Sequence, residues 1–167
     1  MKALFFIDFE LFSDDLKRRI SSYRLKIPAN VPVIWTITNE DSRKPSAKDG
    51  FYAGYDRIFT KPDIDASFET AKDETGLALM DYLKPSGITA GYIGGSTFYG
   101  CVLYGGLSMK SVGIIPVIMT DLTDFDEILE ADHEEAKDDF TQSKIATINS
   151  SQVLTILLSN PPKPNLT

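Results

Sequence analysis

The chain has 167 residues, of which 43% are hydrophobic and 25% charged, with a net charge of −7 and a pI of about 4.7. This is the composition of an ordinary globular protein, long enough for one domain with a sizeable core. The acidic charge argues against non-specific binding to nucleic acid or anionic membranes, and no apolar run is long enough to span a bilayer. One cysteine excludes an intramolecular disulfide and favours a reducing compartment.

The first apolar run covers residues 2–8 and ends on an acid, which predicts a strand buried on both faces. Asp8 and Glu10 interrupt this run too early for the apolar core of a signal peptide. We therefore expect a cytoplasmic protein.

Ser13 is placed to cap a helix that continues to about Leu25, and residues 31–38 form a second β-rich run. Charges, glycines and three aromatic residues follow in the segment 39–55. A loop of this length is either functional, such as a lid over a flat or apolar ligand, or a mobile surface excursion. Both interpretations stay open.

Residues 57–62 predict a third strand, which ends at Lys61 because the next residue is a proline. Apolar residues near helical spacing predict a helix over residues 73–83. A fourth strand follows at residues 88–93.

A glycine pair and the chain's one cysteine follow the fourth strand. Gly94 and Gly95 predict a tight turn, and a helix is expected over residues 100–110. Cys101 would then lie at a helix N-terminus, where the helix dipole favours the thiolate. The alternative is that Cys101 packs as a small buried hydrophobe.

The rest of the chain continues the alternation of strands and helices. The expected elements are a strand at 114–119, a helix within the acidic segment 124–140, a strand at 144–148 and a helix at 151–158. We expect a single domain over residues 1–160 and a flexible tail over 161–167.

Strands that alternate with helices predict a three-layer α/β/α fold, with a mainly parallel, Rossmann-like sheet of about six strands. Ligands of such sheets bind at the carboxyl ends of the strands. Asp8, Lys61 and Cys101 all lie at or just past strand ends. Taken singly, Asp8 could cap a helix and Lys61 could be a solvated strand end, but together they predict a site at one edge of the sheet.

The residues around these three positions resemble the isochorismatase-like cysteine hydrolases, the superfamily of nicotinamidases, carbamoylsarcosine amidase and ureidoacrylate amidases. The resemblance runs from Ala3 to about Leu154. It rests on Phe6-Ile7-Asp8, on Thr60-Lys61-Pro62 followed by Ala66-Ser67-Phe68, and on the spacing of Gly95, Cys101-Val102, Gly113 and Asp121.

The resemblance implies a catalytic triad of Asp8, Lys61 and Cys101. A carboxylate beside the thiol can take its proton, an ammonium nearby lowers the pKa of the thiol, and the thiolate attacks an amide carbonyl. The expected product of that attack is a thioester acyl-enzyme. The resemblance also implies backbone donors for the oxyanion at Cys101 and at a cis peptide bond between Thr97 and Phe98.

The walls of the site are expected to include four further residues, namely Phe12, Asn39, Phe68 and Tyr99. Three features depart from the family. Phe98 and Tyr99 replace its threonine and aspartate before the cysteine, and the Ser-Ala-Phe after the lysine is reordered. The metal motif Asp-x-His is missing after the second strand, where the chain reads Thr38-Asn39-Glu40-Asp41, and the one histidine is His133.

These observations predict a cysteine hydrolase that cleaves a C–N bond, amide or ureido, in a small molecule. We expect no metal and no cofactor, because a zinc site needs more nitrogen or sulfur ligands than the chain offers. The resemblance suggests a homo-oligomer, either a dimer or a tetramer, with no nucleic-acid or membrane partner. One alternative is a catalytically inactive relative that binds a small molecule. A nucleotide-binding domain is disfavoured because no Gly-x-Gly-x-x-Gly follows the first strand.

Overall fold

The structure is a computed structural model that describes residues 1–38, 56–62, 67–125 and 130–159, with residues 130–133 described by their backbone alone. The predicted segment 39–55, the residue Asn39 within it and the tail 161–167 therefore lie outside the described residues. The side chain of His133 is not described either.

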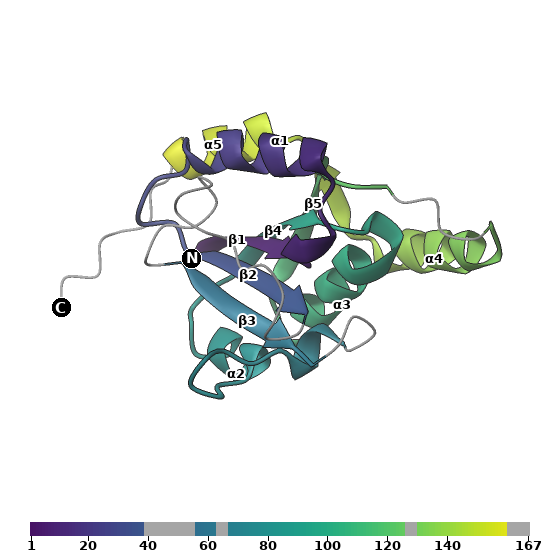
Figure 1. Cartoon of the computed structure of the whole chain (residues 1–167), viewed down its shortest axis with the longest axis horizontal. Helices are drawn as coiled ribbons and strands as arrows, with labels where there is room; N and C mark the ends of the chain where they lie inside the picture. The colour runs from purple at the N-terminus through teal and green to yellow at the C-terminus, as the bar shows by residue number, and fades with distance from the viewer. Residues whose placement is uncertain (39–55, 63–66, 126–129, 160–167) are drawn as a thin grey trace.

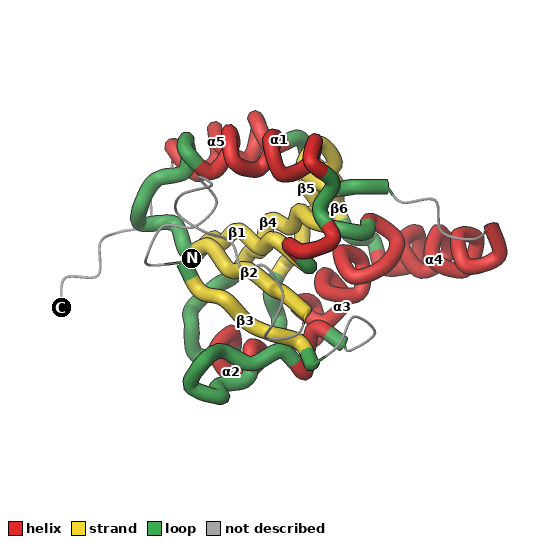
Figure 2. Tube along the Cα trace, viewed as in Figure 1, coloured by secondary structure: helices red, strands yellow, loops and turns green. Residues whose placement is uncertain are grey.

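A parallel sheet of six strands forms the centre of the molecule, in the order β3-β2-β1-β4-β5-β6 (Figures 1 and 2). Every neighbouring pair is parallel. The strands are β1 (Lys2–Ile7), β2 (Val33–Thr38), β3 (Arg57–Lys61), β4 (Ala90–Gly95), β5 (Ile115–Thr123) and β6 (Ala146–Ile148). The prediction of about six strands is confirmed.

Helices cover both faces of this sheet. They are α1 (Asp14–Arg24), α2 (Leu79–Leu83), α3 (Leu103–Ser111), α4 (Glu130–Ser143) and α5 (Ser150–Ser159). Figure 1 shows α1 and α5 together on one side of the strands and α2 on the other. The three-layer α/β/α architecture is confirmed.

Two hydrophobic cores fill the space between the sheet and these helices. On one face, Phe5 and Ile7 of β1 pack with Leu103 and Met109 of α3. On the other face, the alternate residues of β1, such as Phe6, pack with residues of α1 and α5. Adjacent residues of a strand point to opposite faces, so a central strand covered by helices on both sides is apolar throughout.

One predicted helix is much shorter than expected. The prediction over residues 73–83 is wrong for its first half, and only Leu79–Leu83 is helical. The Asp73 carboxylate instead accepts hydrogen bonds from the N–H groups of Thr75 and Leu77. Gly76 lies in this turn with a φ of 85°. An aspartate that bonds to nearby backbone N–H groups favours a turn over a helix.

The chain order places a topological switch between β1 and β4. The sequence builds outward from β1 through β2 to β3 on one side, and from β4 through β5 to β6 on the other. The carboxyl ends of β1 and β4 therefore flank the crevice where ligands bind in this kind of sheet. Within the described residues, no helix combines the length and the apolar character needed to cross a membrane.

Candidate active site

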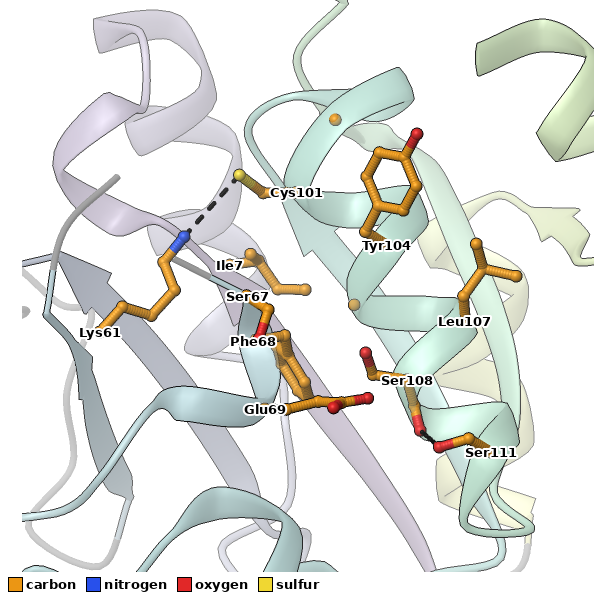
Figure 3. A pocket seen from close by; sticks show the side chains of 12 residues that line it. Ile7, Lys61, Ser67, Phe68, Glu69, Cys101, Tyr104, Leu107, Ser108 and Ser111 are labelled. Atoms are coloured by element: carbon orange, nitrogen blue, oxygen red, sulfur yellow. Dashed lines mark hydrogen bonds between the residues drawn. The ribbon is translucent and has the colours of Figure 1, made fainter. Parts of the chain in front are cut away.

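Asp8, Lys61 and Cys101 come from three different elements and meet at the carboxyl edge of the sheet. Asp8 directly follows β1, Lys61 is the last residue of β3, and Cys101 lies in η4 (Phe98–Val102), the turn that leads into α3. Lys61 Nζ lies 2.8 Å from Asp8 Oδ2 and 3.8 Å from Cys101 Sγ. The structure thus brings the three predicted residues together, and Figure 3 shows two of them, Lys61 and Cys101.

The backbone of Asp8 is in the left-handed region, with φ 59° and ψ 58°. Asp and Asn tolerate this conformation better than most other residues with a side chain. The N–H of Asp8 donates to Thr36 Oγ1 at 3.0 Å, and the Thr36 hydroxyl donates back to Asp8 Oδ1 at 3.3 Å. The two carboxylate oxygens of Asp8 therefore accept from different donors: Oδ1 from the Thr36 hydroxyl and Oδ2 from the Lys61 ammonium.

The Asp8–Lys61 pair is buried, with side-chain exposures of 0% and 2%. Two opposite charges held at this depth stabilise each other because neither has water to solvate it. Removing one partner would leave the other charge uncompensated. The pair thus fixes an ammonium beside the sulfur of Cys101.

Burial is the main influence on the Cys101 thiol. It raises the pKa of the thiol to about 12, together with the negative charge and a hydrogen bond of Asp8, while Lys61 acts in the opposite direction. This direction is opposite to the expected one, because the ammonium of Lys61 does not offset burial and the charge of Asp8. The helix α3 itself begins only at Leu103, two residues after the cysteine. A shift in this direction favours the thiol over the thiolate, so a base is needed to take the proton when the sulfur reacts.

A second carboxylate, Glu10, lies close to this group. Glu10 Oε1 accepts hydrogen bonds from the N–H of Thr38, at 2.7 Å, and from its hydroxyl. Its other oxygen, Oε2, is buried without a hydrogen-bond partner among the described residues. Burial raises the pKa of Glu10, and the charge of Asp8 adds to this effect. Sequence reasoning used Glu10 only as a break in an apolar run.

A cavity of about 570 Å³ opens beside Cys101 and continues between α3 and the turn η3 (Phe68–Thr70). We call it the α3 trough. Figure 3 shows Lys61 and Cys101 at one end of it and Ser108, Ser111 and Glu69 toward the other. Its lining residues are Ile7, Lys61, Ser67, Phe68, Glu69, Gly100, Cys101, Tyr104, Gly105, Leu107, Ser108 and Ser111.

Known protein structures resemble this fold over most of its length, although neither a family model nor a curated protein matches the sequence. An isochorismatase-like hydrolase from Alkaliphilus metalliredigens has a TM-score of 0.66 and 13% identity, with 93% of this chain and 98% of that chain covered. The chain has the isochorismatase-like hydrolase fold.

Two other structures with this fold differ in what they are described to do. The YcaC protein of Escherichia coli, an octameric hydrolase of unknown specificity, has a TM-score of 0.69 and 16% identity, with 95% and 80% of the two chains covered. The MAR1 ribonuclease of Caenorhabditis elegans has a TM-score of 0.66 and 21% identity, with 98% and 84% covered. At such identities the likeness establishes the fold and leaves the activity to be argued from the site.

Of the residues predicted to wall the pocket of this isochorismatase-like fold, Phe68 lines the trough and two others do not. Phe12 is 3% exposed and packs in the core on the opposite face of the sheet, against Phe9. Tyr99 packs against Phe98 and the side of α4 instead. Neither side chain is among those that line the cavity.

The cis peptide bond joins Ser96 to Thr97, one residue earlier than expected. The N–H of Phe98 donates to the backbone oxygen of Asp124 at 2.9 Å, so it is already bonded and does not serve as an oxyanion donor. The N–H of Asp124 in turn donates to Gly95 O at 2.9 Å. These two bonds attach the turn before Cys101 to the end of β5.

Sequence reasoning missed most of the trough. Tyr104, Ser108 and Ser111 follow Cys101 at intervals of three or four residues, which places them on one face of α3. That spacing was a usable signal. Among the side chains that the structure describes, no group of three or more His, Cys, Asp or Glu residues is placed to hold a metal ion.

Proposed function

We propose that this protein is a cysteine hydrolase that cleaves an amide or ureido C–N bond in a small molecule through a thioester acyl-enzyme. The observation that carries the proposal is the convergence of Asp8, Lys61 and Cys101, of which Lys61 and Cys101 line the α3 trough, with Lys61 Nζ 3.8 Å from the sulfur. A nucleophile with a base and a cation beside it is the arrangement that covalent catalysis requires.

In the proposed first step, Asp8 takes the proton of the Cys101 thiol as the sulfur attacks the carbonyl carbon. An S–C bond forms and the carbonyl electrons move to oxygen. When the oxyanion collapses, the C–N bond breaks and the proton returns from Asp8 to the leaving nitrogen. Water then attacks the thioester with Asp8 again as base, which releases the acid and restores the thiol.

Lys61 has two roles in this proposal. Its ammonium offsets the charge of the thiolate as it forms, and it holds the Asp8 carboxylate toward the sulfur. We propose that the N–H groups of Cys101 and Thr97 donate to the oxyanion, since the N–H of Phe98 is bonded elsewhere.

The test is a screen for ammonia or amine release from simple carboxamides, nicotinamide among them, and from N-carbamoyl amino acids. Activity should vanish in Cys101→Ala, and Asp8→Asn should lower kcat/KM by roughly 10²- to 10⁴-fold. Asn is chosen because it also tolerates the left-handed backbone of position 8. Activity that survives Cys101→Ala would rule out covalent catalysis by this thiol.

The second candidate is a protein that binds a small molecule without processing it. The raised pKa of Cys101 favours this alternative, because a thiol that rarely ionises is a weak nucleophile without its base. Intact-mass spectra during turnover separate the two candidates. A mass increase at Cys101 that hydroxylamine removes indicates an acyl-enzyme, whereas binding without any such adduct supports the second candidate.

We further propose that the protein works in a reducing, cytoplasmic setting as a homo-oligomer. The single cysteine supports the first part, and the octameric YcaC structure with the same fold supports the second. The net charge of −7 argues against nucleic acid as the partner. Sedimentation or light scattering at several concentrations tests the oligomeric state.

A further inference from the structure

The shape of the α3 trough restricts which substituents a substrate can carry. The trough begins at Cys101 and follows α3 to Ser111, so it is elongated along the helix (Figure 3). From Cys101 to Ser108 the chain advances by seven residues, which is about 10 Å at the usual helical rise. Its volume of about 570 Å³ lies within the usual range for small-molecule sites.

The middle of the trough is apolar. Ile7 and Phe68 line it from the sheet side and η3, and Leu107 lines it from α3. Gly105 allows α3 to approach this closely, because a Cβ there would lie 2.5 Å from Ile7 Cδ1. An aliphatic chain would gain hydrophobic contacts in this section, and a charged group would lose its hydration there.

At the far end of the trough, the one charged side chain among the described lining residues is the carboxylate of Glu69. Glu69 lines it as an exposed carboxylate with no hydrogen bond or ion pair to any residue of the described part. Figure 3 shows this side chain extending toward α3 at the level of Ser108. Among the described residues that line the trough there is no arginine, and the one lysine, Lys61, lies at the opposite end with its ammonium bonded to Asp8.

At the end of the trough beside Cys101, the one positive charge among the described lining residues is the ammonium of Lys61, and it is paired with Asp8. Asp8 and Lys61 offset each other, and the Glu10 carboxylate lies close enough to influence both. On the α3 side, the Tyr104 hydroxyl donates to Asp139 Oδ2 at 3.2 Å, which places another acid next to the trough. A carboxylate-bearing substituent would thus meet several acids, and no guanidinium among the described lining residues would bind it.

We propose that the substituent in the α3 trough is an extended aliphatic chain that ends in a cation such as a primary ammonium, bound by Glu69. This inference rests on the proposed function, since it names the substrate class for the same site. The scissile amide lies at Cys101, the methylene chain contacts Ile7, Phe68 and Leu107, and the ammonium donates to Glu69 and Ser108.

The experiment measures binding and reactivity separately. Binding is measured in the Cys101→Ala background, where this sulfur cannot attack an amide, with three N-hexyl acetamides that differ only at the chain end, which is an ammonium, a methyl or a carboxylate group. The dissociation constants are measured by titration calorimetry or ligand-observed NMR. The ammonium compound should bind roughly threefold to tenfold more tightly than the carboxylate compound, with a smaller difference at high salt.

Variants then test whether Glu69 causes the preference for the ammonium compound over the carboxylate compound. Glu69→Gln should abolish this preference, and Glu69→Lys should reverse it. Glu74→Gln, another exposed acid but outside the trough, should leave it unchanged. Equal binding of all three compounds, no binding by any of them, or a preference that survives Glu69→Gln would each overturn the inference.

Reactivity is tested with the chloroacetamides of the same three chains. Attack by the Cys101 sulfur on the chloromethyl carbon forms an S–C bond and breaks the C–Cl bond, so that chloride leaves and the thiol proton passes to Asp8. Intact mass detects the added acetamide group. Failure of all three to label Cys101 counts against the nucleophile, and therefore against the proposed function. The binding series still decides the charge preference, so the two failures are distinguishable.

Discussion

Lys61 Nζ donates to Asp8 Oδ2 at 2.8 Å, and both side chains are removed from solvent. The two residues come from β3 and from the end of β1, which are separated in the sheet by β2. The pair therefore connects the edge strand of the sheet to its centre across β2. It also sets the charge next to Cys101, so stability and reactivity depend on the same contact.

Replacing Lys61 with methionine should be strongly destabilising. The variant keeps most of the side-chain volume but leaves the Asp8 carboxylate buried without its cation, which costs about 3–5 kcal/mol in comparable pairs. Urea denaturation followed by circular dichroism measures the loss. The double variant Asp8→Asn/Lys61→Met should lose less than Lys61→Met alone, because no buried charge is left. A double variant that is less stable than Lys61→Met would contradict this explanation.

The Cys101 thiol should titrate at alkaline pH. Its pKa of about 12 predicts that the rate of alkylation by iodoacetamide keeps rising above pH 9, the ordinary value for a thiol. Asp8→Asn should shift the profile to lower pH, because the charge of Asp8 raises the pKa, and Lys61→Met should shift it to higher pH. A plateau near or below pH 8 in the wild type would instead support the low pKa expected from the sequence.

The sequence predicted the position of this site because strand ends are easy to locate. Apolar runs closed by Asp8 and by Lys61-Pro62 mark where two strands stop, and a parallel sheet brings such ends to one edge. It did not predict the direction in which the pKa of the Cys101 thiol shifts, which depends on how many atoms from distant segments exclude water. Burial of this kind is a property of packing, not of local pattern.

The walls of the cavity were harder to predict for the same reason. Phe12 follows Asp8 closely in sequence, yet the turn after β1 directs it into the opposite core, beside Phe9. Glu69 became relevant only because η3 packs against α3, a contact between segments more than thirty residues apart in sequence. Asp73 shows that apolar spacing alone does not determine local structure. Its hydrogen bonds to the N–H groups of Thr75 and Leu77 form a turn where the spacing had predicted a helix.

Glu10 should make stability depend on pH in a defined direction. Its folded-state pKa is raised by burial above the ordinary 4.5, so its neutral form is favoured in the folded protein. The free energy of unfolding therefore includes a contribution that is fully present below about pH 4.5 and is lost as pH rises through the folded pKa.

The variant Glu10→Gln tests this prediction, because its side chain cannot ionise and keeps an acceptor for Thr38. Its stability relative to wild type should increase between pH 4 and pH 7, by less than about 1 kcal/mol since the group is partly exposed. Chemical denaturation across this pH range measures the difference in free energy of unfolding between the variant and the wild type. A difference that does not change with pH would refute the prediction.

Gly95 should be intolerant of any side chain because β1 approaches it too closely. A Cβ at this position would lie 2.3 Å from Ile7 O and 2.7 Å from Ile7 N, and the φ of 135° is itself unfavourable for other residues. Since Asp8 follows Ile7 directly, relief of the clash would displace the candidate base from Lys61. Gly95→Ala should therefore lower the free energy of unfolding by roughly 3 kcal/mol or more, as backbone strain and overpacking add together.

Gly76→Ala is the matched control for this prediction. Gly76 also has a positive φ, of 85°, but no atom lies within 4 Å of the Cβ it would gain. Its replacement should cost only about 1–2 kcal/mol, the conformational part of the effect. Urea denaturation of both variants separates the free-energy cost of the positive φ from the cost of the clash between the new Cβ and β1. If the two substitutions cost the same, the close approach of β1 and β4 is not what requires glycine at position 95. If Gly95→Ala folds but loses reactivity at Cys101 while Gly76→Ala keeps it, the spacing between β1 and β4 also positions the site.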